Sequence, residues 1–390
     1  MSLIKKYILS KRLFYYINAS IKNYKLEKGH ALLSKKYNTT EMAYKKKELL
    51  YKKKQYISSL NKNKKKEKLS ALWIGVIKSQ DNSGCIQALE KHLNLTVFYR
   101  ENDKYGLKIH PSKKETYKEM RDNNTKELKR YLNDDFDIII GQYWNYAIDG
   151  SALNDAKKRG SVIFNISMDD MLYDLWSSNC GFVRGASGLG DFVDVTLTTS
   201  PVFESYYAHR DMTAKYFPLA TSRDQFYEDV NVIRDIDVLF IGNNYGMRSE
   251  YINYLIDKGI NVEVYGNGWG TKYLNQDEMA SYSKRAKIIL GFGGVAYSKT
   301  IPTMKLRDFD SIMSGALYLT QYNNVLEQHF KENEDIIFFS DKVSCLNKIK
   351  YFLNNHIERV DIAQKGQHKC LKHHTWELRF ENLFKEFDLK

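Results

Sequence analysis

The chain has 390 residues, of which 43% are hydrophobic and 14% aromatic, and its net charge at neutral pH is +13. This length and apolar content suffice for two domains with their own cores, while no run of about 18 apolar residues that could span a membrane occurs. The four cysteines, Cys85, Cys180, Cys345 and Cys370, are too far apart for a C-x-x-C motif, so we expect a reduced cytoplasmic protein without a secretory leader.

The positive charge is concentrated at the N-terminus. Residues 1–68 contain 20 Lys and Arg against four acidic residues, a net +16, so the remaining chain carries −3. Apolar residues recur at helical spacing from Leu3 to Ile21, and a lysine-rich helix or linker follows from Lys45 to Lys68. A basic amphipathic helix of this kind suits an anionic membrane surface; packing on the body or a second subunit, or RNA contact, are the alternatives. The acidic body argues against DNA as a partner.

A first α/β domain is predicted for residues 69–218. It opens with the apolar run Ala71–Ile77, a polar loop, and a helical pattern from Cys85 to Leu93. This order is typical of the first βα unit of a doubly wound parallel sheet, in which ligands bind beyond the strand C-termini. The loop lacks the G-x-G-x-x-G spacing, so a dinucleotide site is not supported.

Polar and aromatic side chains follow two predicted strands of this domain. The run Gln142–Asn145 follows one strand, and Ser167–Asp170 follows another. Aromatic faces stack on sugar C–H groups and carboxylates accept hydrogen bonds from hydroxyls, so these runs predict a sugar-binding wall. Asp169 and Asp170 are the candidates for contacting the reacting sugar or acting as a base. The alternatives are that Trp144 belongs to an interdomain core and that Asp170 is a helix N-cap before Met171–Trp176.

A second α/β domain is predicted for residues 219–373, followed by a closing helix at 374–390. The strand Ile236–Gly242, a loop and a helix from Ser249 to Lys258 repeat the opening βα pattern. Glycine and asparagine residues follow three strands here, and in a parallel sheet such positions share one edge. These candidate nucleotide-binding residues are Gly242, Asn243, Asn244, Gly266, Asn267, Gly293 and Gly294.

The segment Lys305–Thr320 has the clearest functional signal. It predicts a short helix with Lys305 and Arg307 in its first turn, ended by Gly315 and followed by a buried strand. Together with Arg248, these cations could neutralise a diphosphate leaving group in place of a divalent metal, so no metal is expected. Asp310 would then accept hydrogen bonds from ribose hydroxyls. The alternative is an ordinary amphipathic helix with solvated charges.

The same segment, with Leu326–Phe330, Asp335–Phe339 and His374–Arg379, resembles the C-terminal domain of group 1 glycosyltransferases, closest to the CgeB-like spore maturation branch. The resemblance implies the GT-B arrangement: two Rossmann-like domains facing across a cleft, the nucleotide sugar on the second, the acceptor on the first, and the last helix returning to the first. Asp310 matches the second acid of the family's paired-glutamate motif. Pro302 stands where the first acid would be, which leaves the donor-sugar contact and the stereochemical course open.

The predicted function is therefore a metal-independent glycosyltransferase. It would move a sugar from a nucleotide diphosphate sugar to a hydroxyl of a glycan, lipid-linked or protein acceptor, in the cytoplasm or at the inner face of the cell membrane. Arg307, with Asp169 or Asp170, would be catalytic. The alternatives are a nucleotide-sugar epimerase of the same architecture, and a non-catalytic scaffold that residues 1–68 recruit to a membrane or RNA.

Overall fold

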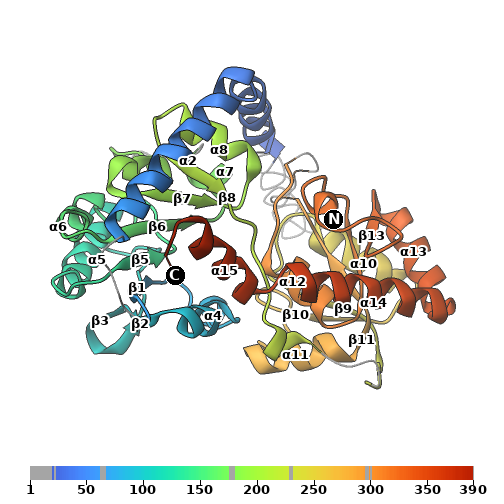
Figure 1. Ribbon diagram of the computed structural model, residues 1–390. Helices are drawn as coiled ribbons and strands as arrows, with labels where there is room; N and C mark the ends of the chain where they lie inside the picture. Colours follow the sequence, from blue (N-terminus) through green and yellow to red (C-terminus); the bar gives the residue numbers. More distant parts are fainter. Residues whose placement is uncertain are drawn as a thin grey trace.

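The computed structural model describes residues 20–21, 23–61, 67–174, 181–227, 232–294, 298 and 301–389. Two parallel β-sheets, each flanked by helices, form two lobes that lie side by side (Figure 1). The predicted α/β class is confirmed. Because parallel strands need helical crossovers, both faces of each sheet are covered and the strands are almost entirely apolar.

The first lobe contains a six-stranded sheet in the order β2-β1-β5-β6-β7-β8. All neighbouring strands in it are parallel. Four residues of β1, from Ala71 to Ile74, are completely buried, which is the pattern of a strand covered on both faces. The strands are β1 Ser70–Ile74, β2 Asn94–Val97, β5 Ile138–Gly141, β6 Val162–Ser167, β7 Val195–Thr198 and β8 Ala214–Tyr216, with a small antiparallel pair β3 Tyr99–Arg100 and β4 Lys104–Tyr105.

The second lobe contains a five-stranded parallel sheet in the order β10-β9-β11-β12-β13. The predicted segment around Lys305–Thr320 forms a helix and strand of this lobe, separated by Gly315 in the left-handed conformation (φ 72°). The strands are β9 Ile236–Ile241, β10 Val262–Tyr265, β11 Ala286–Gly291, β12 Leu317–Gln321 and β13 Ile337–Phe339.

Helices connect the strands in both lobes. Those of the extension and the first lobe are α2 Thr40–Asn61, α3 Lys78–Asp81, α4 Cys85–His92, α5 Tyr117–Tyr131, α6 Asn154–Lys158, α7 Asp170–Tyr173, α8 Pro201–Ala208 and α9 Arg223–Phe226. Those that follow β9 are α10 Arg248–Asp257, α11 Gln276–Arg285, α12 Leu306–Met313, α13 Lys342–Asn354, α14 His356–His373 and α15 Trp376–Glu386.

The chain passes between the lobes twice, and the two crossings lie side by side. Thr221 on the first crossing donates its N–H to the carbonyl of His374 (3.0 Å) and accepts from the N–H of Trp376 (3.0 Å) on the second. After the second crossing, α15 packs against α4 of the first lobe (Figure 1). Trp376 and Phe380 are buried there, and full burial of one such side chain is worth about 1.5–3 kcal/mol.

The described part of the N-terminal extension is helical and lies on the first lobe. Helix α2 packs against α8 and β8, with Ile57 completely buried, and residues 23–37 are also helical. The predicted apolar stripe from Leu3 onward lies outside the described residues as far as residue 19. No described helix is both long enough and apolar enough to cross a membrane.

Candidate active site

The loops after β9 and β10 are joined by hydrogen bonds at one edge of the second sheet. The N–H of Gly242 donates to the carbonyl of Tyr265 (2.7 Å), and the N–H of Asn244 donates to the carbonyl of Asn267 (2.8 Å). The side-chain oxygen of Asn243 accepts from the N–H of Asn267 (3.3 Å). The structure therefore brings these predicted residues together, and the two asparagines act mainly by fixing the loops.

Glycine is required at two of these positions because other groups approach the backbone closely. A Cβ on Gly242 would lie 2.6 Å from Nη2 of Arg307. A Cβ on Gly266 would lie 2.5 Å from the carbonyl oxygen of Gly242, and Gly266 has a φ of 131° that other residues rarely adopt. The glycine after β9 thus makes room for a guanidinium group at the sheet edge.

Arg307 points its guanidinium group at this edge without a protein partner. It is the second residue of α12, half-buried, and its guanidinium lies 5.3 Å from the ring centre of Phe240. No described residue forms a hydrogen bond or ion pair with it, and its buried Nε is unsatisfied. A buried, unpaired donor of this kind is costly, which is the usual sign of a group that binds a ligand.

Arg248 lies beside it and is held firmly. It is the first residue of α10 and only 3% exposed; its Nη1 donates to the carbonyl of Asn243 (2.7 Å) and its Nη2 to the hydroxyl of Tyr245 (2.9 Å). Burial, followed by the neighbouring charge of Arg307, lowers the pKa of Arg248 to about 10. The group stays charged at neutral pH, and the two guanidiniums repel each other.

Lys305 completes the group of cations at the start of α12. Its Nζ lies 3.4 Å from the carbonyl of Phe292 and 3.3 Å from that of Gly294, so the loop after β11 positions the ammonium group. Burial lowers the pKa of Lys305, and the charge of Arg248 lowers it further. Asp308 accepts a hydrogen bond from the backbone N–H of Lys305 (2.7 Å), which fixes the first turn of the helix.

These three cations, Arg248, Lys305 and Arg307, are called the cation cluster below. None of them forms a salt bridge with a carboxylate among the described residues. Three positive charges therefore converge at a helix N-terminus, where backbone N–H groups add to the positive potential. The arrangement fits a diphosphate.

Gly293 and Gly294 belong to the loop that supports this cluster. The carbonyl of Gly293 accepts from the N–H of Thr303 (2.9 Å), and Gly294 pairs with Pro302 in an isolated bridge. A Cβ on Gly294 would lie 2.1 Å from the carbonyl oxygen of Ser298. Both glycines thus shape the chain that leads into Lys305. Their observed contacts do not place them at a ligand surface.

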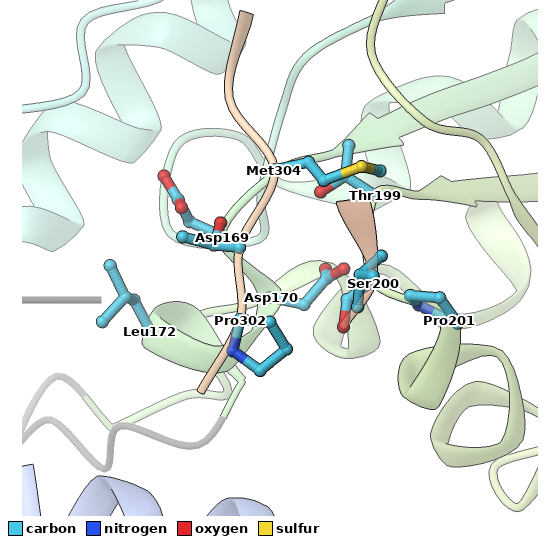
Figure 2. A pocket seen from close by; sticks show the side chains of 10 residues that line it. Asp169, Asp170, Leu172, Thr199, Ser200, Pro201, Pro302 and Met304 are labelled. Atoms are coloured by element: carbon cyan, nitrogen blue, oxygen red, sulfur yellow. The ribbon is translucent and has the colours of Figure 1, made fainter. Parts of the chain in front are cut away.

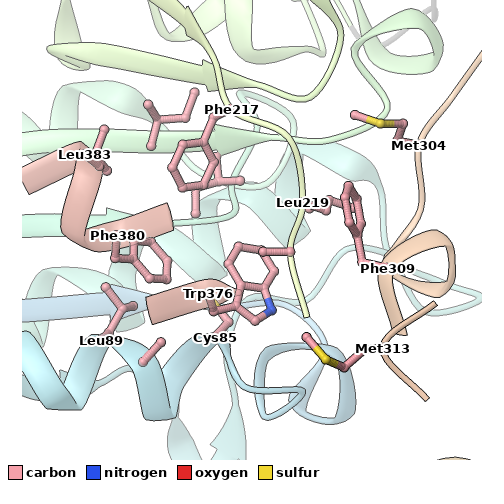
Figure 3. Close-up of a cluster of buried hydrophobic side chains, with 14 of the residues drawn as sticks. Cys85, Leu89, Phe217, Leu219, Met304, Phe309, Met313, Trp376, Phe380 and Leu383 are labelled. Atoms are coloured by element: carbon pink, nitrogen blue, oxygen red, sulfur yellow. The ribbon is translucent and has the colours of Figure 1, made fainter. Parts of the chain in front are cut away.

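Asp310, the predicted ribose acceptor, faces the crossing between the lobes. Its Oδ1 accepts from the hydroxyl of Thr221 (2.6 Å), while Oδ2 makes no hydrogen bond with a described residue. Burial raises the pKa of Asp310 to about 7, and the bond from Thr221 and the charge of Arg307 oppose the rise. Apolar side chains back this crossing, with Leu219 of one lobe beside Phe309 of the other (Figure 3).

A pocket between the lobes lies on the other side of Lys305. Figure 2 shows Asp169, Thr199 and Ser200 of the first lobe facing Pro302 and Met304 of the second. Its ten lining residues are Asp169, Asp170, Leu172, Thr199, Ser200, Pro201, Pro302, Thr303, Met304 and Val325.

Asp169 presents a free carboxylate at this pocket. It follows β6 with a φ of 57°, is exposed, and makes no hydrogen bond through its side chain with a described residue. Although the residue as a whole is exposed, desolvation of its carboxylate by the surrounding protein raises the pKa of Asp169, and the positive charge of Lys305 opposes that rise. Asp and Asn adopt this left-handed backbone more readily than other residues with side chains, so the turn after β6 is compatible with aspartate at this position.

Asp170 has a different environment from its neighbour. The carboxylate is 1% exposed and accepts hydrogen bonds from the hydroxyls of Ser167, Thr198 and Tyr207. Burial and the nearby charge of Asp174 raise its pKa to about 7. It is the first residue of α7 and not the N-cap, which is Asp169. The predicted N-cap position is therefore one residue off, and the observed bonds give Asp170 a structural role within the first lobe.

The predicted aromatic wall does not form as expected. Tyr143 is fully buried and Trp144 is 4% exposed, stacked on Tyr146 at 5.8 Å between ring centres. Trp144 is a core residue, as the alternative held, but it packs almost wholly among residues of the first lobe and not between the domains. Side chains that pack against each other on both faces have no free face for a sugar.

Several residues near the site were not predicted from the sequence. Thr199 and Ser200 follow β7 just as Asp169 follows β6, so the same strand-end rule would have found them. Thr221 had no signal, because its bond to Asp310 joins positions 89 residues apart. Among the described residues, no group of three or more His, Cys, Asp and Glu side chains is arranged to hold a metal ion.

The comparisons with known proteins agree with this arrangement. No curated protein matches the sequence of the chain. Residues 248–385 match the family described as glycosyl transferase-like. A sucrose-phosphate synthase from Thermosynechococcus elongatus superposes with a TM-score of 0.58 at 12% identity, over 82% of this chain and 99% of that one. The chain has the GT-B fold.

Two further solved structures are similar to this chain in fold. The Anabaena protein HepE, in complex with UDP-glucose, has a TM-score of 0.59 at 9% identity over 82% of this chain and 99% of HepE. A UDP-N-acetylglucosamine 2-epimerase has a TM-score of 0.52 at 10% identity over 83% of this chain and 98% of the epimerase. The GT-B fold of this chain places the cation cluster on the second lobe, within the segment that matches the glycosyl transferase-like family, and Asp169 on the first lobe.

Proposed function

We propose that this protein is a glycosyltransferase that uses a nucleotide diphosphate sugar as donor. The observation that supports this most strongly is the cation cluster, since Arg248, Lys305 and Arg307 form no salt bridge with a described carboxylate. A diphosphate would bring its negative charge into direct contact with these cations. The match of residues 248–385 to the glycosyl transferase-like family supports the same assignment.

Sugar transfer breaks the bond between the anomeric carbon and the diphosphate oxygen. The diphosphate departs with the electron pair, and the cation cluster stabilises the negative charge that develops on it. The acceptor hydroxyl oxygen bonds to the anomeric carbon and releases its proton. Asp169, with its free carboxylate at the pocket between the lobes, contacts the reacting sugar or accepts this proton.

The remaining contacts follow from the same placement. The free Oδ2 of Asp310 accepts from a ribose hydroxyl, while Thr221 holds Oδ1. Gly242 and Gly266 allow the loops after β9 and β10 to lie close to the cluster. Because the cluster provides the positive charge, we propose that transfer does not need a divalent metal.

The acceptor is proposed to be a hydroxyl of a glycan, a lipid-linked sugar or a protein, and the enzyme to work in the cytoplasm. Membership of the CgeB-like branch belongs to this proposal. The UDP-N-acetylglucosamine 2-epimerase shares the fold at 10% identity, so an epimerase is the second candidate.

The deciding experiment is a thermal-shift screen of the full chain against UDP, GDP, CDP, dTDP and ADP, with and without a metal chelator. Binding at about 100 times the dissociation constant stabilises the folded state by roughly 2.7 kcal/mol. We expect a selective shift that survives the chelator and is lost in Arg307→Glu. The control is Lys350→Glu, which reverses an exposed charge on α13.

Two results would contradict the proposal. A shift of equal size in Arg307→Glu would show that the cation cluster does not bind the diphosphate. Conversion of a nucleotide sugar to its epimer without any acceptor would identify the second candidate instead.

A further inference from the structure

The two helices of the N-terminal extension have one side on the body of the protein and one side free. On the inner side of α2, lysines pair with acids of the body. These ion pairs are Lys45 with Asp211 (2.7 Å), Lys46 with Glu204 (3.0 Å), Lys53 with Asp194 (3.1 Å) and Lys54 with Glu386 (2.6 Å). These ion pairs hold α2 in one orientation on the body.

The other side of these helices combines exposed apolar and cationic residues. Tyr44 and Tyr51 of α2 are 71% and 64% exposed, and Tyr24 and Leu32 of the first helix are 64% and 58% exposed. The lysines among them form no ion pair with a described residue. We call this set the outer face: Tyr24, Lys25, Lys28, Leu32, Lys35, Tyr44, Lys47 and Tyr51.

The spacing of these residues puts them on one side of each helix. Residues 24, 28, 32 and 35 recur every three to four positions, as do 44, 47 and 51. Two acids, Glu41 and Glu48, also lie on this side of α2, and Glu48 pairs with Lys52 four residues on. The lysines of the outer face outnumber these acids, so its net charge is positive.

We propose that the outer face binds the surface of an anionic lipid bilayer. Lysines on such a face meet anionic headgroups, while tyrosine and leucine side chains enter the boundary between headgroups and acyl chains. The exposed tyrosines and Leu32 lie next to these lysines on one face, which is the combination that an anionic bilayer surface binds. Binding to a polyanion such as RNA would use the lysines but leave Leu32 without a partner.

The first helix of the extension lies close to the pocket between the lobes. Glu27 of the first helix accepts a hydrogen bond from the hydroxyl of Ser298 in the second lobe. Leu26 packs against the same apolar cluster as Ile301, which immediately precedes the pocket residue Pro302. In Figure 1 the first helix of the extension lies at the edge where the two lobes approach each other, while α2 runs across the first lobe. A bilayer bound there would bring a lipid-linked acceptor near the pocket, a consequence that rests on the proposed function.

The test is co-sedimentation of the full chain with vesicles of phosphatidylcholine alone or mixed with phosphatidylglycerol. We expect binding to the mixed vesicles only. In Lys25→Gln/Lys28→Gln/Lys47→Gln the partition coefficient should fall about 100-fold, because each lysine near an anionic surface contributes about 1 kcal/mol. Tyr44→Ser/Tyr51→Ser should weaken binding as well.

The matched control removes three exposed lysines elsewhere on the first lobe. Lys113→Gln/Lys114→Gln/Lys118→Gln changes the net charge equally, and we expect it to bind vesicles like the unmodified chain. All variants should keep their thermal midpoint and their shift with the nucleotide diphosphate. Loss of that shift in the unmodified chain would refute the proposed function without affecting this inference.

Three outcomes would overturn the inference. The first is equal pelleting of the lysine variant and the unmodified chain. The second is binding that falls equally in the control variant, which would indicate an effect of net charge alone. The third is a lack of specific vesicle binding. The unmodified chain would then pellet with neither vesicle type, or it would bind RNA, lose that RNA binding only in the lysine variant, and show unchanged vesicle binding in Leu32→Ser.

Discussion

Replacement of Gly242 by alanine should displace Arg307 without unfolding the protein. The added Cβ would lie 2.6 Å from Nη2, about 0.8 Å closer than an ordinary contact of 3.4 Å. The obstructed atom is the end of a flexible side chain, so the guanidinium can move aside. Gly242 also has a φ of 159°, which side chains rarely adopt, so we expect a stability cost of about 1–3 kcal/mol.

The effect on the donor should be much larger. A hydrogen bond to a charged group is worth about 1.5–3 kcal/mol, so a displaced guanidinium should weaken diphosphate binding by about 10- to 150-fold. Isothermal titration with the diphosphate found in the screen measures the affinity, and the transfer rate at saturating acceptor and subsaturating donor measures kcat/KM for the donor. Unchanged affinity and rate in Gly242→Ala would refute the assignment of Arg307.

A double-mutant cycle separates two explanations of this loss. If Gly242 only makes room for Arg307, then Gly242→Ala should have no further effect in the Arg307→Ala background. If the backbone of Gly242 itself approaches the diphosphate, the alanine should weaken binding in both backgrounds. An additive result would therefore show that the contact between these two residues is not the reason for the glycine.

Three other predictions concern the neighbouring residues. Thr221→Val removes the hydrogen bond to Asp310, so the pKa of Asp310 should rise further and the acidic limb of the pH–rate profile should move to higher pH. The variant should lose about 1 kcal/mol of stability. An unmoved profile would show that Asp310 does not titrate in the reaction. Asp170→Asn should lower the free energy of unfolding in urea by about 1–3 kcal/mol, whereas Asp169→Asn should lower activity and leave stability unchanged; the opposite pattern would reverse their roles. Burial lowers the pKa of His329 to about 4, so below pH 6.5 the unfolded chain binds more protons than the folded one. The difference in the free energy of unfolding between the unmodified chain and His329→Gln should therefore shrink by up to about 1.4 kcal/mol per pH unit, down to about pH 4. A difference that stays constant with pH would contradict this.

The two parallel sheets and the position of the cation cluster could be predicted from the sequence. Apolar runs such as Ala71–Ile74 are long enough for a strand buried on both faces, and glycine after each run predicts a turn at the strand end. Once the strands are taken as parallel, the rule that their C-termini share an edge brings Gly242 and Arg307 together. This argument uses only local patterns and one topological regularity.

Differences between neighbouring residues could not be predicted in this way. Asp169 and Asp170 are chemically identical, and only the packing of β6, β7 and α8 decides that the second meets three hydroxyls while the first faces the pocket. Trp144 was similarly ambiguous, because an aromatic side chain after a strand can line a cleft or fill a core. Burial depends on which distant segment covers a residue, and local sequence has no information on that.

The sequence by itself therefore determined the α/β class, the strand-end edge, and the separation of a basic extension from an acidic body. The tertiary structure decided which charges are neutralised. It pairs Lys45, Lys46, Lys53 and Lys54 with acids from distant parts of the chain, whereas Lys25, Lys28 and Lys47 form no ion pair with a described residue. An ion pair needs contact within about 4 Å, and such contacts between residues more than a hundred positions apart exist only after the lobes and the extension have packed.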